Sequence, residues 1–340
     1  MLEGRALGFV AKYRNVFVIS PADLVTGGPE SLHQLAHAIR QQGGNAFISY
    51  YPRGCGAGTP EAYRGYDLAV ADPVDEPGNL VVIPESAAGI VWEFKRASTA
   101  IWWLSVDNFY GPRPESDTEY RRLVEMHAAR SACAELTGRP TWDEMRKIRN
   151  FAQSAYAASF LAQRNIASVM LESPPHSDFL AAPLVGERQD RIAFNPKKGA
   201  AVVERLSRRF PEFGWLPLTG LTRSGMRDAL ATAKLYVDFG FHPGRERMPR
   251  EAALCGACVV TGKRGSARFP ADIPIPGRYR LDEQGVWFER LFAWTARSIL
   301  RNHAWHAQRF EPYRRFVAAL SERFPRQVAA AFFDEAQTPT

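Results

Sequence analysis

Short apolar runs of strand length alternate with helix-forming segments along most of this 340-residue chain. In the first half, the runs VFVIS at 16–20, NAFISY at 45–50 and LVVIP at 80–84 predict strands. Apolar residues at helical spacing between the first two runs predict a helix, and Gly43 and Gly44 would end it. Runs without polar alternation are typical of parallel strands that are buried on both faces. The pattern therefore predicts a doubly wound α/β fold.

The alternation stops and then restarts near the middle of the chain. Residues 173–190 (SPPHSDFLAAPLVGERQD) mix proline, charge and small residues without a sustained period, as inter-domain linkers do. Strands are predicted beyond this segment at 191–194, 212–218, 235–239 and 257–261, with helices at 199–209 and 222–233. A chain of this length exceeds the size at which one hydrophobic core keeps growing. We therefore expect two Rossmann-like domains joined by a hinge.

The predicted domain boundaries follow from this pattern. Residues 1–180 are assigned to an N-terminal domain and residues 186–300 to a C-terminal domain. Residues 301–333 are assigned to C-terminal helices that pack back on the N-terminal domain, with helix interruptions near Pro312 and Pro325. Within the N-terminal domain, further predictions are strands at 100–106 and 167–171, a helix at 86–96 and a helix-rich stretch at 120–164.

Composition restricts the class of protein and its partners. With 46% hydrophobic and 23% charged residues, the chain has the composition of a soluble globular protein. No apolar run is long enough to span a bilayer, and the first residues lack the apolar core of a secretory signal, so a cytoplasmic protein is expected. The formal charge of +7 favours anionic partners, such as nucleotide phosphates or an anionic membrane face. Because the basic residues are not interleaved with aromatic ones, nucleic acid is not expected.

Cysteine and histidine patterns do not predict a metal site. Cys255 and Cys258 form a single CxxC without a second pair, which predicts small buried residues. His33 and His37 have the spacing of a zinc protease motif, but Gln34 stands where the general base is required. No metal ligands are therefore assigned.

Glycine-containing loops follow the first predicted strand of each half. Ligands of doubly wound sheets bind at the carboxyl ends of strands, so these loops are the first candidates for a site. The first loop (PADLVTGGPES) carries Gly27 and Gly28 at a helix start, where backbone N–H groups favour anions or hydroxyls. The loop of the second half (FNPKKG) carries Asn195, Lys197, Lys198 and Gly199. Lysines beside a glycine at a helix start suit a diphosphate.

The segment DFGFHPGRERMPREAALCGACVV, residues 238–260, is the richest in charge. His242 and Gly244 form a predicted turn after a buried strand, and a helix is predicted from about Pro249 to Leu254, with Glu251 in its first turn. The remaining candidates nearby are Arg247, Arg250, Gly265 and Ser266. Arginines and a helix N-terminus converge here after a strand, which indicates an anion site.

Taken together, GGPES, FNPKKG and HPGRERMPREAALCGACVVTGKRGSA resemble a retaining glycosyltransferase of the GT-B type, and are most similar to bacterial transferases of polysaccharide assembly. The resemblance implies two Rossmann-like domains that face a central cleft, an N-terminal acceptor domain and a C-terminal nucleotide-sugar domain. It implies that Gly27 and Gly28 face the donor, that Lys198 and Gly199 bind its diphosphate, and that Glu251 contacts its ribose.

The sequence departs from the family pattern in two places. The arginine that usually accompanies the donor-binding lysine is not evident, and Asn195 and Lys197 stand nearby instead. The family carries a second glutamate eight residues before the helix glutamate, and Pro243 stands there in this chain. The resemblance therefore implies a rebuilt donor site with His242, Arg247 and Glu251 as the catalytic set. Its donor-binding set is Gly27, Gly28, Asn195, Lys197, Lys198, Gly199, Gly244, Arg250, Gly265 and Ser266. Asp107 and Asn108, which follow a predicted strand of the N-terminal domain, are assigned to the acceptor side.

The expected function is transfer of a sugar from a nucleotide-sugar donor to a hydroxyl of a glycan or lipid-linked glycan, in bacterial surface polysaccharide assembly. No metal and no cofactor beyond the donor are expected, and peripheral association with the inner face of the membrane is left open. Two alternatives also stay open: a nucleotide-sugar epimerase on the same fold, and a non-catalytic glycan-binding or scaffolding relative. A nicotinamide dehydrogenase is disfavoured, because Thr59 and Pro60 break the only segment that resembles a dinucleotide fingerprint.

Overall fold

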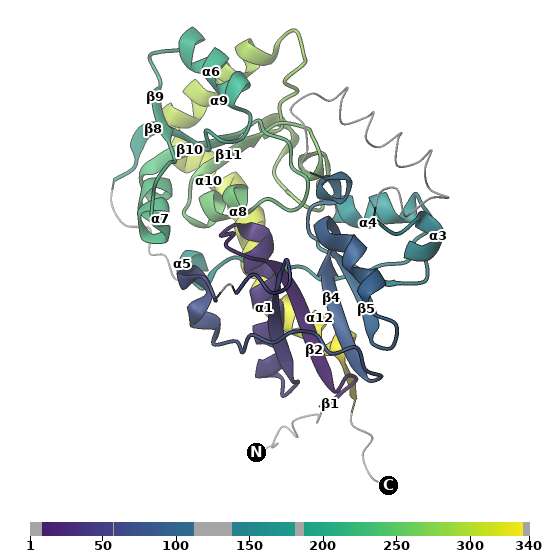
Figure 1. The fold of residues 1–340 in the computed structure, drawn as a ribbon. Helices are drawn as coiled ribbons and strands as arrows, with labels where there is room; N and C mark the ends of the chain where they lie inside the picture. Colours follow the sequence, from purple (N-terminus) through teal and green to yellow (C-terminus); the bar gives the residue numbers. More distant parts are fainter. Residues whose placement is uncertain (1–8, 57, 112–137, 181–186, 336–340) are drawn as a thin grey trace, which may run out of the picture. The chain divides into compact units, whose positions relative to one another are not determined.

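A computed structural model describes residues 9–56, 58–111, 138–180 and 187–335, and divides the chain into two compact units (Figure 1). The first unit contains the residues up to Ser173 together with those from Arg323 onward, and the second unit spans Pro174–Glu322. The first boundary lies before the predicted residue 180, because Phe179 of α5 (Ser177–Leu180) is buried in the core of the second unit. Cys133 and residues 120–137 of the predicted helix-rich stretch lie outside the described residues.

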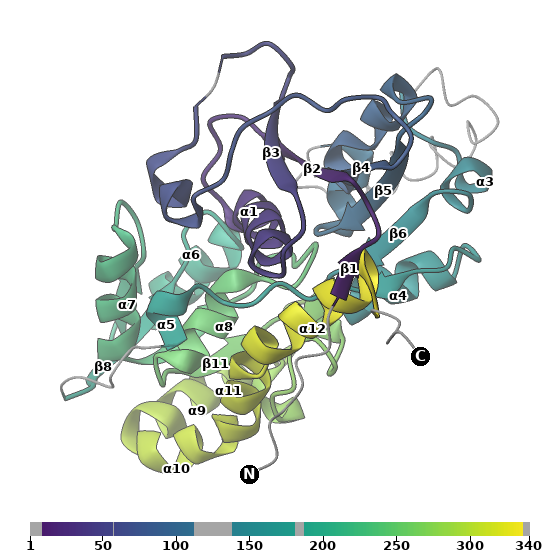
Figure 2. The same ribbon diagram turned by 90° about the horizontal axis from the view of Figure 1, so that it is seen from below.

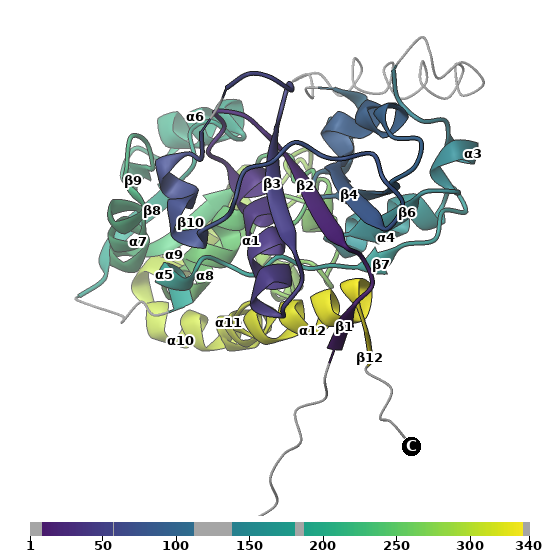
Figure 3. The ribbon, with the colours of Figure 1, turned by 60° about the horizontal axis from the view of Figure 1, so that its bottom comes forward.

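The first unit is built on a six-stranded sheet with the order β3-β2-β4-β5-β6-β7, and every neighbouring pair is parallel. Figure 3 shows β3, β2 and β4 side by side. The strands are β2 (Asn15–Pro21), β3 (Ala46–Tyr51), β4 (Asn79–Pro84), β5 (Ser98–Trp103), β6 (Arg149–Ala152) and β7 (Val169–Met170). Strand β6 lies within the stretch predicted to be helix-rich, so that prediction is wrong there. Its four residues are too few to show a period.

Alternate residues of the central strands pack into two different cores. Val16 and Val18 face a core that is covered by α1 (Gly27–Gln41) and by α12 (Leu320–Phe332). Figure 2 shows α1 beside β2 and β3, and the end of α12 beside β1 (Phe9–Ala11). Phe17 and Ile19 point the other way. That second core is covered by η2 (Glu85–Glu93), η3 (Val106–Tyr110), α3 (Trp142–Met145) and α4 (Ala155–Ala162), and η1 (Glu61–Tyr66) packs beside α1. Burial on both faces explains the uninterrupted apolar runs.

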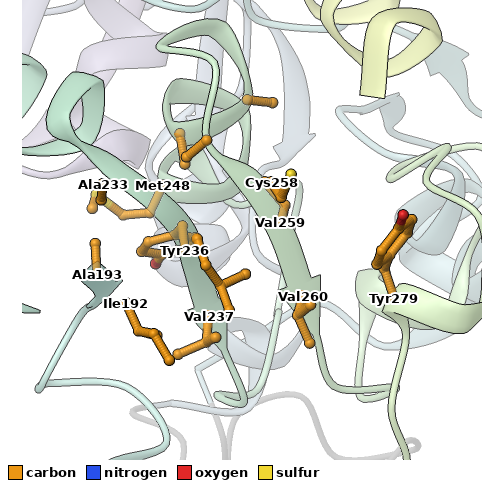
Figure 4. Packing of buried hydrophobic residues seen from close by; sticks show 14 of the residues in the cluster. Ile192, Ala193, Ala233, Tyr236, Val237, Met248, Cys258, Val259, Val260 and Tyr279 are labelled. Carbon is orange, nitrogen blue, oxygen red and sulfur yellow. The ribbon is translucent and has the colours of Figure 1, made fainter. Parts of the chain in front are cut away.

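The second unit contains a four-stranded parallel sheet with the order β11-β10-β8-β9. Its strands are β8 (Gln189–Phe194), β9 (Gly214–Pro217), β10 (Ala233–Asp238) and β11 (Cys258–Thr261), all predicted from the sequence. Figure 4 shows side chains of β8, β10 and β11 packed together in its core. After α5, its next helices are α6 (Ala200–Arg209), α7 (Arg223–Thr232) and α8 (Arg247–Leu254). The Thr222 side chain caps α7 by accepting the N–H of Gly225 at 3.1 Å.

The last part of the chain is helical and ends in the first unit. Its helices are α9 (Phe288–Arg301), α10 (His303–Ala307), α11 (Glu311–Ala318) and α12, and β12 (Phe333–Glu335) then pairs antiparallel with β1 (Phe9–Ala11). Pro312 stands in the first turn of α11, where its missing N–H needs no partner. The predicted interruption at Pro325 is wrong, because α12 continues through it. Phe324 and Val328, on either side of Pro325, are held in the first core.

Each sheet has a point at which the strand order reverses. In the first sheet, β2 lies between β3 and β4, and in the second, β8 lies between β9 and β10. Connections leave such neighbouring strands toward opposite faces of the sheet, which opens a crevice at their carboxyl ends where ligands bind. In the second unit, the two loops at this point are residues 195–199 and 239–246.

Phe324 makes α12 part of the first core, where its ring stacks on Trp102 with centroids 6.4 Å apart. We predict that Phe324→Ala lowers the free energy of unfolding by about 3–5 kcal/mol, because it removes a buried ring and leaves a cavity. Arg326→Ala is the control, since this neighbour on the same helix is exposed. It should change the free energy by less than about 0.5 kcal/mol in urea unfolding. Equal effects of the two substitutions would contradict the assignment of α12 to the core.

Candidate functional site

A buried carboxylate stands at the reversal point of the second sheet. Asp238 ends β10 and is 2% exposed. Its Oδ2 accepts the hydroxyl of Tyr236 at 3.1 Å, its Oδ1 accepts the N–H of Gly240 at 3.1 Å, and Nε2 of His242 lies 3.2 Å from Oδ1. Burial opposes its charge, but His242, Lys198 and the Gly240 N–H hold the pKa of Asp238 below its usual value. Asp238 is therefore ionised, and its contacts with Gly240 and His242 fix the conformation of the loop after β10.

His242 is fixed by its backbone as well as by Asp238. It forms a parallel bridge with Gly265, and its carbonyl oxygen accepts the N–H of Ser266 at 2.8 Å. The side chain is completely buried. Within the described residues, Nδ1 of His242 has no hydrogen-bond partner. A buried ring nitrogen without a protein partner is a feature to be expected where a ligand binds.

Gly199 brings the loop after β8 against the loop after β10. It is the N-cap of α6 and has a φ of 62°, in the left-handed region that favours glycine. A β-carbon at this position would lie 2.7 Å from the amide nitrogen of Gly240. The two loops therefore meet backbone to backbone. This close approach leaves the first-turn N–H groups of α6 beside the Asp238 cluster.

Lys198 and Lys197 have different surroundings, although they are neighbours in the chain. Lys198 Nζ forms an ion pair with Glu246. Burial alone would lower the pKa of Lys198, but the charges of Glu246 and Asp238 raise it, so the ammonium stays protonated. Lys197 is exposed and makes no ion pair with a described residue. Its N–H donates to Oδ1 of Asn195 at 3.0 Å, so Asn195 closes the turn.

Arg247 and Glu251 form the second ion pair of the site, with Nε and Oε1 3.0 Å apart. Helix α8 begins at Arg247, earlier than the predicted Pro249, because proline is accommodated in a first helical turn. Glu251 consequently lies in the second turn, and the prediction that places it in the first turn is wrong. Arg247 is 35% exposed and Glu251 only 1%. The guanidinium therefore faces outward, with the carboxylate behind it.

Two further arginines support the loop. Arg245 is buried, and its Nη2 lies 2.9 Å from Oδ1 of the equally buried Asp272. Arg250, predicted to bind the donor, donates from Nε to the carbonyl oxygen of Glu246 at 3.2 Å and from Nη2 to that of Arg245 at 3.4 Å. Burial and the nearby charge of Arg245 lower the pKa of Arg250 to about 10. These contacts make Arg250 a support for the loop backbone.

The loop after β11 completes the cluster. Gly265 has a φ of 60°, and a β-carbon there would lie 2.0 Å from the carbonyl oxygen of His242. Ser266 Oγ donates to the carbonyl oxygen of Gly244 at 2.5 Å. Arg264 Nη2 donates to the carbonyl oxygen of Phe239 at 2.9 Å. Most of the candidates in the second unit therefore lie in three loops tied to one another, whereas the side chain of Lys197 is exposed.

The cluster has a simple electrostatic layout. Lys198 and Arg247 are 31% and 35% exposed, whereas their carboxylate partners Glu246 and Glu251 are 15% and 1% exposed. The cations thus stand at the accessible side, with the negative charges behind them. Burial raises the pKa of the Tyr236 phenol, and the surrounding carboxylates raise it further. Exposed cations beside a helix N-terminus suit an anion with several oxygens, such as a phosphate.

The first unit places its candidates separately. Gly27 and Gly28 form the first residues of α1, and a β-carbon at Gly28 would be 4.0 Å from the nearest neighbouring atom, in Leu104. Asp107 and Asn108 lie in η3 after β5, and Asp107 is buried. Asp107 Oδ2 accepts the Tyr156 hydroxyl at 3.4 Å. These residues lie beyond the carboxyl ends of β2 and β5.

Glu85 is a candidate that the sequence predictions missed. It directly follows β4, one of the two strands at the reversal point of the first sheet, and is 2% exposed. Its Oε2 accepts the N–H of Leu104 at 2.8 Å. Burial raises the pKa of Glu85 to about 8, with a smaller contribution from the charge of Asp107. An acidic residue immediately after an apolar strand was the signal in the sequence.

Two other motifs have structural roles. His33 has Nδ1 2.7 Å from the carbonyl oxygen of Pro29 and Nε2 2.9 Å from the Tyr50 hydroxyl, so both ring nitrogens are occupied within the core. Cys255 and Cys258 are buried, as predicted, and burial raises the pKa of each thiol to about 12. Across the described ranges, no three His, Cys, Asp or Glu side chains are grouped to hold a metal ion. No described helix is long and apolar enough to cross a membrane.

Comparisons with known proteins identify the fold. No protein-family model matches the sequence, and no curated protein matches it. Among solved structures, sucrose-phosphate synthase from Thermosynechococcus elongatus has a TM-score of 0.62 at 12% identity, covering 93% of this chain and 98% of its own. The catalytic domain of starch synthase IV from Arabidopsis thaliana, bound to ADP and acarbose, has a TM-score of 0.55 at 10% identity (94% and 100% covered).

A third similar structure is the lipopolysaccharide outer core galactosyltransferase WaaB, with a TM-score of 0.57 at 9% identity, covering 92% of this chain and 98% of its own. These solved structures share the GT-B architecture. The chain therefore has the GT-B fold with two Rossmann-like domains, which confirms the predicted fold class. At such identities the likeness concerns the fold, and activity is a separate question.

Gly199 and Gly220 allow steric contact to be separated from backbone strain. Their φ angles are 62° and 64°, but a β-carbon at Gly220 would have no atom within 4 Å. We predict that Gly220→Ala costs about 1 kcal/mol of unfolding free energy, because only the left-handed backbone is strained. Gly199→Ala should cost about 1–3 kcal/mol more, because its methyl group meets Gly240. Urea unfolding measures both, and equal losses would rule out the close approach of the two loops.

Glu85 should make stability depend on pH. Its folded-state pKa of about 8 exceeds the ordinary value of 4.5, so between these values the folded chain holds a proton that the unfolded chain has released. Raising the pH from about 5 to 8 should therefore lower the free energy of unfolding, by on the order of 3–4 kcal/mol from this residue.

Glu85→Gln should remove this part of the pH dependence, since its neutral amide can still accept the Leu104 N–H. Glu93→Gln is the control, because Glu93 is an exposed glutamate of the same η2 segment. Urea unfolding at several pH values compares the three proteins. Parallel profiles for the wild type and Glu85→Gln would show that the buried carboxyl does not titrate in this range.

Proposed function

We propose that this protein is a glycosyltransferase that moves a sugar from a nucleotide-sugar donor to a hydroxyl of a glycan or glycolipid acceptor. The observation that carries the proposal is a pair of accessible cations at the reversal point of the second sheet. Lys198 adjoins the N-terminus of α6, and Arg247 follows Glu246, the ion-pair partner of Lys198, in the chain. The GT-B fold, shared with structures named as sugar-transferring enzymes, supports the same reading. The acceptor class is proposed to be that of bacterial surface polysaccharide assembly.

The donor diphosphate is proposed to bind at the two cations. Lys198 exchanges Glu246 for a phosphate oxygen, and the first-turn N–H groups of α6 contribute further donors. Breaking the bond between sugar and phosphate places negative charge on the leaving diphosphate, and fixed positive groups stabilise that charge without reorganising. Because these cations supply the stabilisation, the proposed reaction requires no metal ion.

The main role proposed for Glu251 is to orient the guanidinium of Arg247. Its carboxylate is buried behind the guanidinium and fixes its direction. The predicted contact of Glu251 with the donor ribose requires Arg247 to move toward the diphosphate, which would open the carboxylate to hydroxyl groups. Asp238 acts in the same way on His242, because it orients the ring and leaves Nδ1 for the sugar. A retaining outcome is part of the proposal, as is an acceptor held by the first unit near Asp107 and Asn108.

Lys198 and Lys197 offer a matched test of the donor site. We predict that Lys198→Met weakens the binding of UDP, GDP or ADP, whichever binds the wild type, by about ten- to a hundredfold, because a charge-assisted bond to phosphate is lost. Lys197→Met should change the dissociation constant by less than about twofold, since that ammonium is outside the cluster. Isothermal titration calorimetry measures both, with Glu251→Gln as a third variant expected to weaken binding. If Lys198→Met and Glu251→Gln bind like the wild type, the donor site is elsewhere.

A panel of nucleotide sugars distinguishes the proposed activity from its alternatives. A donor that binds only the folded chain raises its apparent stability, so thermal unfolding identifies the donor. Product analysis with that donor then decides the reaction class. Release of nucleoside diphosphate with a glycosylated acceptor supports transfer, and an isomeric nucleotide sugar indicates an epimerase. Acceptor binding without any donor turnover indicates a scaffolding relative.

A further inference from the structure

The α9 helix of the second unit carries large apolar side chains on its solvent side. Leu291 and Trp294 are 50% and 64% exposed, and Trp287, the residue before the helix, is 58% exposed. Val286 is 91% exposed. The opposite face of the helix is fully buried in the core through Phe292, Ala296 and Ile299. The exposed residues are therefore an additional apolar surface and not a displaced core face.

A groove rich in arginine lies beside these side chains. It has a volume of about 670 Å³, and both α6 and α9 line it. Its arginines are Arg205, Arg209, Arg290, Arg297 and Arg301, and its acidic residues are Glu283 and Glu289. Arg205 pairs with Glu289 at 3.1 Å, and Arg297 with Glu212 at 2.8 Å. The other three arginines form no ion pair with any residue in the described ranges, so their charge is open to an external anion.

Helical spacing sorts the two kinds of side chain into adjacent stripes. Residues three or four positions apart share a face of a helix. Arg290, Arg297 and Arg301 follow this spacing along one line. Trp287, Leu291 and Trp294 follow it along the neighbouring line. A basic stripe beside an apolar, tryptophan-rich stripe is the pattern of a helix that lies in the interface of a membrane.

We propose that this surface binds an anionic phospholipid membrane. The α9 face, as we call it, consists of Val286, Trp287, Arg290, Leu291, Trp294, Arg297 and Arg301 of the α9 segment with Arg205 and Arg209 of α6. Lipid phosphates enter the groove and pair with its arginines, while the two tryptophans and Leu291 enter the level of the headgroups. The chain's formal charge of +7 adds attraction to an anionic surface. The proposal does not depend on the transfer reaction.

The composition of the α9 face favours a membrane over two other partners. Leu291 and Val286 cannot stack on bases, which disfavours single-stranded nucleic acid. Arginine and tryptophan also occur in protein interfaces, but a protein partner would have to fix acidic groups opposite several separate arginines with an apolar surface beside them. A fluid, anionic interface satisfies both groups at once.

Vesicle flotation of the full chain tests the proposal. Vesicles of phosphatidylcholine with about one third phosphatidylglycerol should bind the wild type at physiological salt, and pure phosphatidylcholine vesicles should bind it far less. The variant Arg209→Gln/Arg290→Gln/Arg301→Gln should lower the partition coefficient at least about tenfold, because each basic residue near the surface contributes attraction. Trp287→Ser/Leu291→Ser/Trp294→Ser should lower it by a similar factor.

Matched controls remove equal charge or an equal ring elsewhere. Arg40→Gln/Arg64→Gln/Arg96→Gln takes three exposed arginines from the first unit, and Trp92→Ser removes a 39% exposed tryptophan there. Both should bind vesicles within about threefold of the wild type. Thermal unfolding checks that each variant is folded. If the serine variant is unstable, tryptophan fluorescence gives the same answer. Lipid labelled with bromine should quench the fluorescence of the wild type, and it should quench that of Trp287→Phe/Trp294→Phe less.

Several outcomes would overturn the proposal. One is a wild type that does not bind anionic vesicles, and another is an equal loss of binding in the first-unit control. Single-stranded DNA that binds the α9 face, in the absence of vesicle binding, would assign the surface to nucleic acid. Self-association that rises with concentration and is lost in the serine variant, again without vesicle binding, would assign it to a second copy of the chain.

Discussion

The second unit depends on how the buried charge of Asp238 is compensated. A carboxylate removed from water is costly unless fixed donors surround it. Here the donors are the Tyr236 hydroxyl and the Gly240 amide, with the charges of His242 and Lys198 nearby. Each of these four groups belongs to a different part of the surroundings. Tyr236 belongs to the strand, Gly240 to the turn after it, His242 to the end of that turn, and Lys198 to the loop after β8. The same compensation that makes the charge tolerable thus gives the site its geometry.

Steric contact reinforces this electrostatic arrangement. Gly199 against Gly240, and Gly265 against His242, are approaches that leave no room for a side chain. Loops are ordinarily the most mobile parts of an α/β domain. In this unit they are held by buried ion pairs and by backbone contacts on several sides, so the cations at the accessible surface are presented from a rigid base. Preorganised charge of this kind is what binding or stabilising an anion requires.

Strands and loops of the site could be predicted from the sequence because the signal is local. Apolar runs marked β2, β4 and β10, and the glycines and charges after them marked the candidate loops. Pairings could not be predicted, because they join residues distant in the chain or in different loops. The ion pair of Lys198 with Glu246 is a pairing of this kind, and the hydrogen bond from Arg250 to the carbonyl oxygen of Arg245 joins a helix to the loop before it. Strand β6 escaped prediction because it is short, and Glu85 because its importance comes from burial at the carboxyl end of the inner strand β4.

The path of the last helix bears on how the chain is made. Leu320 belongs to the core of the second unit, while Phe324, Val328 and Phe332 belong to that of the first. The first unit therefore lacks part of its core until the final residues of that helix have left the ribosome. Domains usually fold in order from the N-terminus during synthesis. In this protein, the domain that is begun first is completed last, and the second domain has its whole sequence available before the first can close.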